Sequence, residues 1–383
     1  MRQRAFQEGL QGAGGRRPSS IARSGMRRYT CSMPSHVAHL LFADDVVSAA
    51  APDPDLHGLA EPPNRAYLVL GAQGPDIFYH NQRTRPTSIA YGSLMHRRGY
   101  GTCIASMCGW AGRHGLELSS WAGALIVGFA THAVLDRHTH PFVNAHSGWP
   151  EPGDPASEKY RSMHPFLERL IDVELLKLRR GIHPNELRFH RLITCGESPP
   201  AAWVDLMKDA LTRTYRKASR DTKLQARLQN AYRDAMGFYR FTEHVDEAYL
   251  EEALAREDAG RIGPRWLSII HPPEVPAELD VLNRSRRSWP HPCPDGERTT
   301  RSFLDCCDEA LETARTMVAR MAAAWRGAVV DEAEIEDAVG NWNLSDGRPT
   351  ERPCRKRHAQ PLPLRELQTR MRETIRAGRA GRL

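Results

Sequence analysis

Histidine and carboxylate residues recur at four-residue spacing in one segment of this chain. Residues 128–144 place His132, Asp136 and His140 four residues apart, twice in succession. An α-helix turns by about 100° per residue, so these side chains would stack on one face, with neighbouring Cβ atoms about 5–6 Å apart. Side chains at that separation can share or adjoin a metal ion.

A second segment repeats this spacing with His164, Glu168 and Asp172. Imidazole nitrogen and carboxylate oxygen are ligands that suit zinc and similar divalent ions. Two helices that carry such ligands in aligned columns therefore indicate a metal site.

An ordinary structural role is the alternative for each of these residues. A single histidine on an apolar helix is more often a hydrogen-bonded core residue than a metal ligand. Here the column interrupts an apolar run at residues 121–130, which predicts a helix buried on all sides. An aspartate buried between two histidines costs free energy unless it is paired or bound to a metal, so Asp136 favours the metal site. His138 lies about 240° around the helix from His132 and is expected to face elsewhere.

Apolar residues recur with the period of amphipathic helices along most of the chain. This pattern predicts helices over residues 36–50, 116–139, 164–180, 201–218, 223–256, 300–327 and 363–378. Alternating β-branched runs are nearly absent, and residues 66–70 form one short strand candidate without a partner. The fold class is therefore predicted to be all-α. Pro141 disfavours helical geometry at His140, which is expected near the end of its helix.

Long loops are expected at residues 51–65, 71–90, 141–160 and 257–299, and long ordered loops are often functional. In one of them, Gly74 and Pro75 restrict the backbone just before Asp76 and would present its carboxylate. Asp76 could equally be an ordinary turn residue. His96 lies in another helical turn and would be unremarkable alone.

The chain has 383 residues, of which 40% are apolar and 26% are charged, as in a globular protein with one large or two modest domains. No apolar run reaches the roughly 18 residues of a membrane span. Residues 1–32 lack the apolar segment of a secretory signal, so we expect either a disordered basic arm or a start codon assigned too early. The helical domain is expected over residues 33–350, beginning near Met33, and a basic tail with a short helix over residues 351–383.

Eight cysteines are scattered without CxxC pairs, so no disulfide framework is expected and a cytoplasmic location is predicted. The net charge is +7, and much of it lies at the two ends of the chain. These basic ends could make weak contacts with nucleic acid or an anionic membrane, or they could simply be solvated.

Taken together, these residues resemble the bacterial zinc-dependent phospholipase C family, whose fold is related to that of the S1/P1 nucleases. The resemblance covers residues 33–345 and is most specific at residues 128–144. It implies an all-α domain whose helices converge on two or three zinc ions that activate water for phosphodiester cleavage. Other similar segments are residues 33–43, 70–79, 95–96 and 164–172, with weaker similarity at residues 282–283, Trp289 and residues 341–347.

The resemblance also implies particular roles for residues of this chain. Asp136 would bridge two ions. Asp76, from its loop, would approach the ions from the open side and act as the catalytic carboxylate that orients or deprotonates the attacking water. Asn144 and Asp172 would hold imidazoles in the correct tautomer. The implied zinc ligands are His39, Asp76, His96, His132, Asp136, His140, His164 and Glu168.

The chain departs from the secreted phospholipases, in which the amine of an N-terminal Trp binds one zinc. No Trp precedes His39 here, so the site could hold two ions, or His36 could replace the amine. The expected function is a zinc-dependent, phospholipase C-like hydrolase of phosphodiesters, acting on a phospholipid or another substrate. Two alternatives stay open, namely an S1/P1-like nuclease and a non-catalytic helical scaffold that holds structural zinc.

Overall fold

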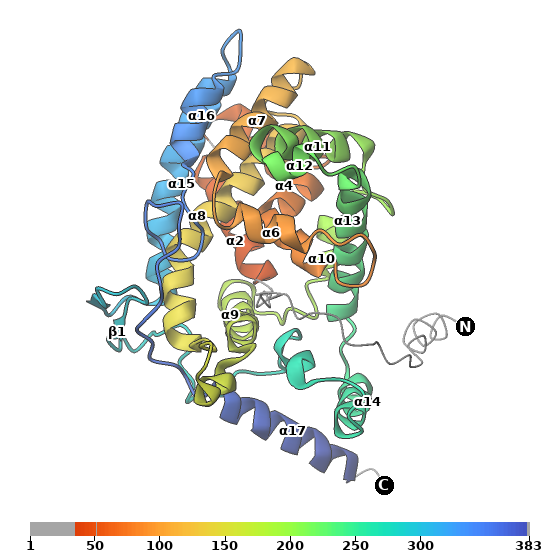
Figure 1. Ribbon diagram of the computed structural model, residues 1–383, viewed down its shortest axis with the longest axis vertical. Coiled ribbons are helices and arrows are strands. Elements are labelled where there is room, and N and C mark those ends of the chain that lie inside the picture. Colours follow the sequence, from red (N-terminus) through yellow and green to blue (C-terminus); the bar gives the residue numbers. More distant parts are fainter. Residues whose placement is uncertain (1–34, 51, 381–383) are drawn as a thin grey trace. The chain divides into compact units, whose positions relative to one another are not determined.

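The computed structural model describes residues 35–50 and 52–380, and this part of the chain is almost entirely helical (Figure 1). The all-α prediction is confirmed for these residues, while the expectations for residues 1–32 and for a domain start at Met33 lie outside them. The α-helices are α2 His36–Ala49, α3 Pro54–His57, α4 Arg65–Ala72, α5 Ile77–His80, α6 Ile89–Met95, α7 Tyr100–Arg113, α8 Trp121–Ser147, α9 Met163–Arg180, α10 Phe189–Ile193, α11 Ala201–Thr214, α12 Arg216–Ser219, α13 Leu224–Thr242, α14 Glu247–Asp258, α15 Phe303–Trp325, α16 Glu332–Val339 and α17 Leu364–Ala380. Short 3₁₀ helices are η1 Gly58–Ala60, η2 Gly74–Asp76, η3 Pro155–Tyr160 and η4 Pro264–Ser268, and β1 Trp289–Pro290 pairs antiparallel with β2 Arg298–Thr299.

Helix α8 is the element around which the candidate site is built. Its N-terminus is capped by Ser120, whose hydroxyl accepts a hydrogen bond from the backbone N–H of Gly123. It contacts α2, α4, α7, α9 and α15, and Figure 1 shows α15 alongside it. Nearly all of its side chains are buried, as the apolar run at residues 121–130 predicts.

Helix α8 continues beyond Pro141 to Ser147, so the expectation that it ends near His140 is wrong. A proline inside a helix costs about 3 kcal/mol, because it removes one backbone hydrogen bond and crowds the preceding turn. The next turn buries Phe142 and Val143 at 0% and 2% exposure. Burial of each such side chain contributes about 1.5–3 kcal/mol, so the two together offset the proline.

Helices α4 and α8 approach each other closely because each has a glycine where they meet. A Cβ added to Gly71 would lie 2.9 Å from the carbonyl carbon of Leu125, and one added to Gly128 would lie 2.8 Å from the amide nitrogen of Ala72. Residues 66–70, the one short strand candidate in the sequence, belong to α4, in keeping with the all-α prediction. A lone buried strand would leave its backbone groups unpaired, whereas a helix pairs them internally.

Several other elements differ from the sequence-based expectation. Residues 223–256 form two helices, because Asp246 caps a new N-terminus by accepting a hydrogen bond of 2.8 Å from the backbone N–H of Tyr249. The expected loop at residues 71–90 contains η2, α5 and the start of α6. Helices α7 and α16 are not predicted by the sequence pattern, and they pack on each other.

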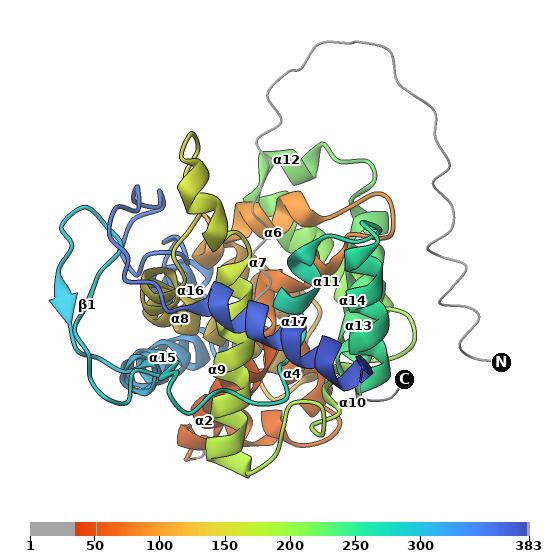
Figure 2. The same ribbon diagram turned by 90° about the horizontal axis from the view of Figure 1, so that it is seen from below.

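The segment expected as a C-terminal tail packs on the helical domain. The backbone N–H groups of Gln360 and Leu362 donate to the carbonyl groups of Ala145 and His146, each at 2.8 Å, along the end of α8. Helix α17 then contacts α9 and α14 (Figure 2).

A disulfide joins Cys293 to Cys354, so the expectation of no disulfide is wrong for this pair. The two cysteines are 61 residues apart in the sequence, and no local spacing marks them as partners. The argument for a reducing compartment depended on the absence of disulfides and loses its basis. Among the residues that the structure describes, no helix combines the length and apolar character needed to cross a membrane.

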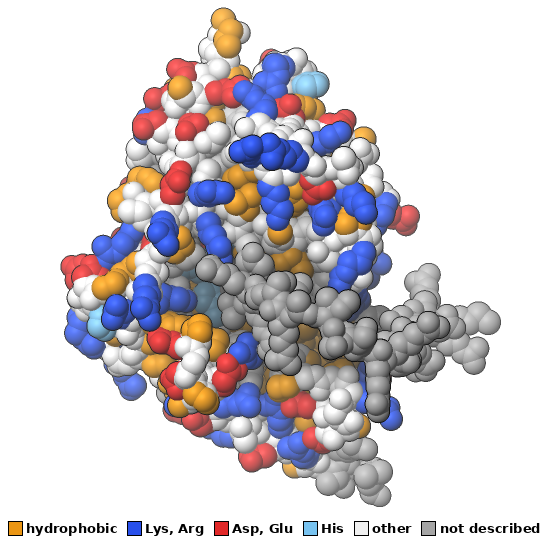
Figure 3. All heavy atoms as spheres, viewed as in Figure 1, with side chains coloured by type: hydrophobic (Ala, Val, Ile, Leu, Met, Phe, Trp, Pro, Cys, Tyr) orange, Lys and Arg blue, Asp and Glu red, His pale blue; other side chains and the backbone are white. Residues whose placement is uncertain are grey.

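Arginines of α17 are paired with acidic side chains. Arg370 lies 2.9 Å from Glu278, and Arg376 lies 2.7 Å from Asp258. On the face shown in Figure 3, Lys and Arg side chains form separate groups with Asp and Glu side chains between them. Exposed pairs contribute little to stability, but they reduce the positive charge that a polyanion would meet.

Candidate metal centre

The side chains expected as metal ligands come from separate segments that meet around α8, and we call them the ligand set. Each has an imidazole nitrogen or a carboxylate oxygen within 3.9 Å of another member. The structure thus brings the whole predicted set together. The set consists of His39 on α2, Asp76 at the end of η2, His96 directly after α6, His132, Asp136 and His140 on α8, and His164 and Glu168 on α9.

The carboxylate of Asp136 lies at the centre of the ligand set. Its Oδ1 is 3.3 Å from Nε2 of His39 and 3.6 Å from Nε2 of His140. Its Oδ2 is 3.2 Å from Nε2 of His132 and 3.6 Å from Nε2 of His96. Each oxygen therefore faces a different pair of histidines, which is an arrangement suited to a carboxylate that bridges two ions.

Asp76 is buried within the ligand set, with only 1% of its side chain exposed, beside His96, whose side chain is 11% exposed. Its Oδ1 is 3.1 Å from Nε2 of His96, and its Oδ2 is 3.6 Å from Nε2 of His132. The expectation that Asp76 approaches from a loop on the open side is therefore wrong. Gly74, at a φ of 51°, begins the 3₁₀ turn η2, and this turn directs the carboxylate inward.

His140, His164 and Glu168 form the outer end of the ligand set. Oε1 of Glu168 is 3.1 Å from Nε2 of His164 and 3.9 Å from Nε2 of His140. Side-chain exposure is 19% for His164 and 10% for His140, compared with 0% for His132. His164 is therefore the most exposed member of the ligand set and marks its more open end, whereas His132 is enclosed.

Backbone carbonyl groups fix the orientation of three imidazoles in the ligand set. A carbonyl oxygen only accepts hydrogen bonds, so each neutral ring carries its proton on Nδ1 and turns an unprotonated Nε2 toward the carboxylates. Metal-binding histidines are commonly held in this way. The Nδ1–H groups donate from His96 to Gly92 at 2.8 Å, from His132 to Ala72 at 3.1 Å, and from His140 to Leu344 at 2.5 Å.

Several buried atoms of the ligand set have no hydrogen-bond partner among the described residues. Buried polar atoms in native proteins nearly always have one, and each atom without a partner costs about 1–3 kcal/mol. Most of these atoms face one another across the set, so divalent cations are the partners that fit this group of donors. The atoms are Nδ1 of His39, both carboxylate oxygens of Asp76, Nε2 of His132, Oδ2 of Asp136 and Oε2 of Glu168.

Protonation of the metal-free ligand set is strongly perturbed. Burial alone would lower the pKa of His132, but the charges of Asp136 and Asp76 raise it to about 9. Burial raises the pKa of Glu168 well above its usual range, and the charge of Asp136 adds to this effect. Burial also lowers the pKa of His164 to about 3. Bound cations would relieve the repulsion among the carboxylates.

His36 and Asp172 belong to a separate buried group. Asp172 accepts hydrogen bonds from Nε2 of His271 at 3.1 Å and from the backbone N–H of Ala38 at 3.0 Å. Nδ1 of His36 accepts one from Arg169. Among the described residues, neither side chain is hydrogen-bonded to the ligand set. His36 therefore does not take the place of the N-terminal amine as a ligand, and Asp172 does not orient an imidazole of the set. His36, Asp172 and His271 could themselves hold an ion, but Arg169 already brings positive charge there.

Residues 341–347, where the sequence resemblance is weak, support the outer end of the ligand set. The carbonyl of Leu344 accepts the hydrogen bond from His140, and that of Ser345 accepts one of 3.1 Å from Nδ2 of Asn144. Asn144 also accepts a hydrogen bond of 2.9 Å from Nζ of Lys356, so it contacts the C-terminal segment rather than an imidazole. Sequence reasoning misses Lys356, because a contact between such distant positions leaves no local spacing pattern.

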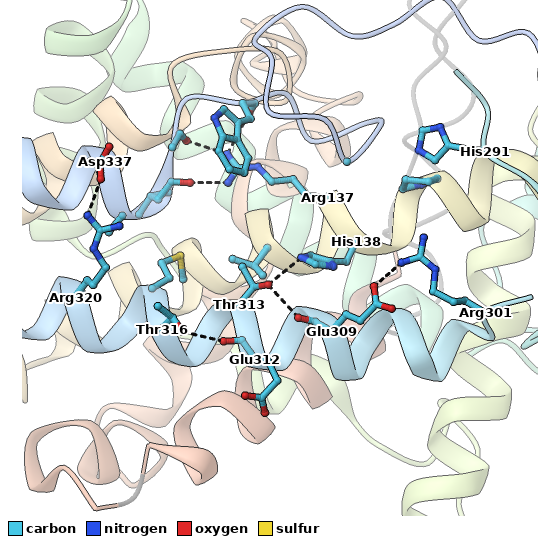
Figure 4. Close-up of a pocket in the computed structure, with 18 residues that line it drawn as sticks. Arg137, His138, His291, Arg301, Glu309, Glu312, Thr313, Thr316, Arg320 and Asp337 are labelled. Carbon is cyan, nitrogen blue, oxygen red and sulfur yellow. Dashed lines mark hydrogen bonds and ion pairs between the residues drawn. The ribbon is translucent and has the colours of Figure 1, made fainter. Parts of the chain in front are cut away.

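A cavity of about 640 Å³ lies beside a different face of α8 (Figure 4). His138 points into it, and its Nε2 is 3.2 Å from the hydroxyl of Thr313, so the expectation that His138 faces away from the column is confirmed. Other charged side chains of the cavity are paired, as Arg301 is with Glu309 at 2.5 Å. No member of the ligand set lines this cavity, which therefore lies apart from the candidate chemistry.

No family model, curated protein or solved structure matches this chain. The structure defines an all-α protein with buried groups of His, Asp and Glu side chains that could hold metal ions. The resemblance to the zinc-dependent phospholipases stays an expectation that depends on the residues alone.

Proposed function

We propose that this chain is a zinc-dependent hydrolase of phosphodiesters. The proposal is carried by the buried oxygen and nitrogen atoms around Asp136, which face one another without hydrogen-bond partners. Imidazole and carboxylate donors suit zinc, and the ligand set offers enough of them for two or three ions. Such ions, when bound, polarise phosphoryl oxygens and lower the pKa of water to about 7.

The position of each ligand suggests its part in the reaction. The Nε2 atoms of the histidines would bind the ions, and Asp136 would bridge them. Asp76 is 1% exposed, and its two oxygens face the Nε2 atoms of His96 and His132. We therefore propose a ligand role for Asp76 in place of the general-base role that the sequence resemblance implies.

The open end of the site favours catalysis over a purely structural role for zinc. Structural zinc sites are closed by four protein ligands, whereas catalytic sites keep a position free for water or substrate. The side chain of His164 is 19% exposed at this end. A scaffold with structural zinc would instead fill every coordination position of its ions with protein ligands.

A small phosphodiester is favoured over a nucleic acid as substrate. A nuclease binds its substrate through a continuous basic surface. On the face shown in Figure 3, the Lys and Arg groups are interrupted by acidic side chains. Nuclease activity is therefore an alternative outcome of the test.

The test combines metal analysis with hydrolysis assays. We expect purified protein to contain zinc and to hydrolyse bis(4-nitrophenyl) phosphate or phosphatidylcholine vesicles, but not single-stranded DNA. His132→Ala should lose zinc and activity together, whereas His138→Ala, on the same helix but outside the ligand set, should keep both. Zinc-loaded protein that hydrolyses none of these substrates would support the scaffold, and protein without affinity for any divalent ion would end the proposal.

A further inference from the structure

The ammonium group of Lys356 lies at the outer end of the ligand column on α8. Its Nζ donates a hydrogen bond of 2.9 Å to Oδ1 of Asn144. Asn144 follows His140 by one helical turn, so Lys356 continues the column beyond its last histidine.

Lys356 has no acidic partner among the described residues, although it is partly buried. Its Nζ lies 4.8 Å from the centre of the Trp149 ring, a cation–π contact that leaves the ammonium free to donate further hydrogen bonds. Burial lowers the pKa of Lys356 to about 8, so the charged form still predominates at pH 7.

Two other cations, Arg137 on α8 and Arg169 on α9, have partners of a different kind. The guanidinium of Arg137 donates to the carbonyl groups of Val339 and Gly340 at 2.6 and 2.9 Å. Arg169 lies 3.4 Å from Asp172. Unlike Arg169, Lys356 therefore has no carboxylate among the described residues to balance its charge.

The charge balance changes when the ligand set holds cations. The carboxylates of the set are then neutralised by the ions, and a partly buried ammonium beside them is unfavourable unless an anion joins it. An anion placed there would lie beside Lys356, one helical turn beyond His140 along α8.

We propose that Lys356 binds an anionic phosphoryl oxygen of the substrate at the open end of the metal site, with Trp149 forming one side of the binding position. This inference rests on the proposed function and adds a substrate-binding residue to it, since a phosphodiester carries a negatively charged, non-bridging oxygen on the reacting phosphorus. A phospholipid headgroup and free phosphate share this chemistry.

The test measures anion affinity separately from metal content. The zinc-loaded full chain is titrated with inorganic phosphate and, separately, with glycerophosphocholine, and the bound zinc is measured for each variant. A charge-assisted hydrogen bond corresponds to about 10- to 100-fold in affinity, so Lys356→Met should weaken phosphate binding by that factor with unchanged zinc. Lys356→Arg, which keeps the charge, should recover part of the loss.

The matched control is Lys159→Met. Lys159 is exposed and lies 5.0 Å from the ring of Tyr160, so it also makes a cation–π contact, but without a hydrogen bond to the ligand column. It should leave anion affinity unchanged. Binding of glycerophosphocholine with the same dependence on Lys356 would point to a headgroup, and binding of phosphate alone to a monoester or free phosphate.

Three results would overturn the inference. Equal phosphate affinity of wild type and Lys356→Met at equal zinc content would remove Lys356 from substrate binding while leaving the metal site intact. Loss of zinc in Lys356→Met, and equally in Lys356→Gln, would show that the lysine supports the ligands through Asn144 instead. A wild-type chain that binds no zinc would end the proposed function and this inference together.

Discussion

Gly74 lies directly against the imidazole ring of His132. A Cβ at position 74 would be 2.6 Å from Cδ2 of that ring, and the φ of Gly74 is 51°, in the left-handed region. The substitution Gly74→Ala would therefore strain the backbone and displace the imidazole ring of His132. We expect a loss of about 1–3 kcal/mol in stability and a clear loss of bound zinc.

Gly58→Ala is the matched control for this change. No atom lies within 4 Å of a Cβ built on Gly58, and its φ of −67° suits any residue. Denaturant unfolding and zinc content should both stay close to wild type. Retention of full zinc by Gly74→Ala would show that the ring of His132 does not have to keep its position.

Chelation provides a second prediction, which concerns the ligand set as a whole. Ions that bind only the folded state stabilise it by an amount set by their concentration relative to the dissociation constant. EDTA should therefore lower the Tm of the wild type clearly and that of Asp136→Ala much less, because Asp136 contacts four histidines of the set. Identical melting curves of the wild type with and without EDTA would contradict a bound cluster.

Asp76→Asn distinguishes a ligand from a general base. Both oxygens of Asp76 lack hydrogen-bond partners and face His96 and His132, so the amide should weaken zinc binding and hydrolysis together. Zinc content and activity are measured on the same preparation. Full zinc content with activity reduced by about 10²–10⁴-fold would restore the general-base role.

The disulfide gives a prediction about stability. It closes a loop between positions 61 residues apart, and the chain-entropy relation assigns about 4 kcal/mol to a loop of that length. We expect Cys293→Ser/Cys354→Ser to reduce the free energy of urea unfolding by several kcal/mol, to the same value that the wild type shows in excess dithiothreitol. Cys195→Ser, at a free and partly buried thiol, should have a small effect by comparison.

Stability of the metal-free protein should fall with acidification. Burial lowers the pKa of His80 to about 3 and that of His271 to about 4, below the ordinary value of 6.5. Between these values the unfolded chain binds more protons than the folded one, so stability is lost as the pH falls below 6.5. At pH 5 each histidine accounts for about 2 kcal/mol.

Urea unfolding in EDTA at pH 7 and pH 5 measures this loss. His80→Gln should show a smaller difference between the two pH values than the wild type, by about 2 kcal/mol. His57→Gln, at an exposed position on α3, should keep the wild-type difference. A variant and wild type with the same pH dependence would mean that His80 is protonated in the folded state.

Local spacing accounts for the parts of the site that sequence reasoning predicts. The columns on α8 and α9 follow from the helical period, so the side chains of His132, Asp136 and His140 necessarily share a face. The inward direction of Asp76 could not be predicted in this way, because it depends on the φ of Gly74 and on packing against α8. For the same reason, the helix end expected at Pro141 is wrong, since burial outweighs local preference there.

The order of residues along the chain has a consequence for biosynthesis. The candidate ligands lie between His39 and Glu168, whereas Leu344, whose carbonyl group accepts the hydrogen bond from His140, comes much later. Because the chain is made from its N-terminus, the candidate ligands leave the ribosome first. The hydrogen bond from His140 to the carbonyl group of Leu344 can form only after residue 344 has emerged. An ion captured earlier would meet an outer end in which His140 still lacks this hydrogen bond.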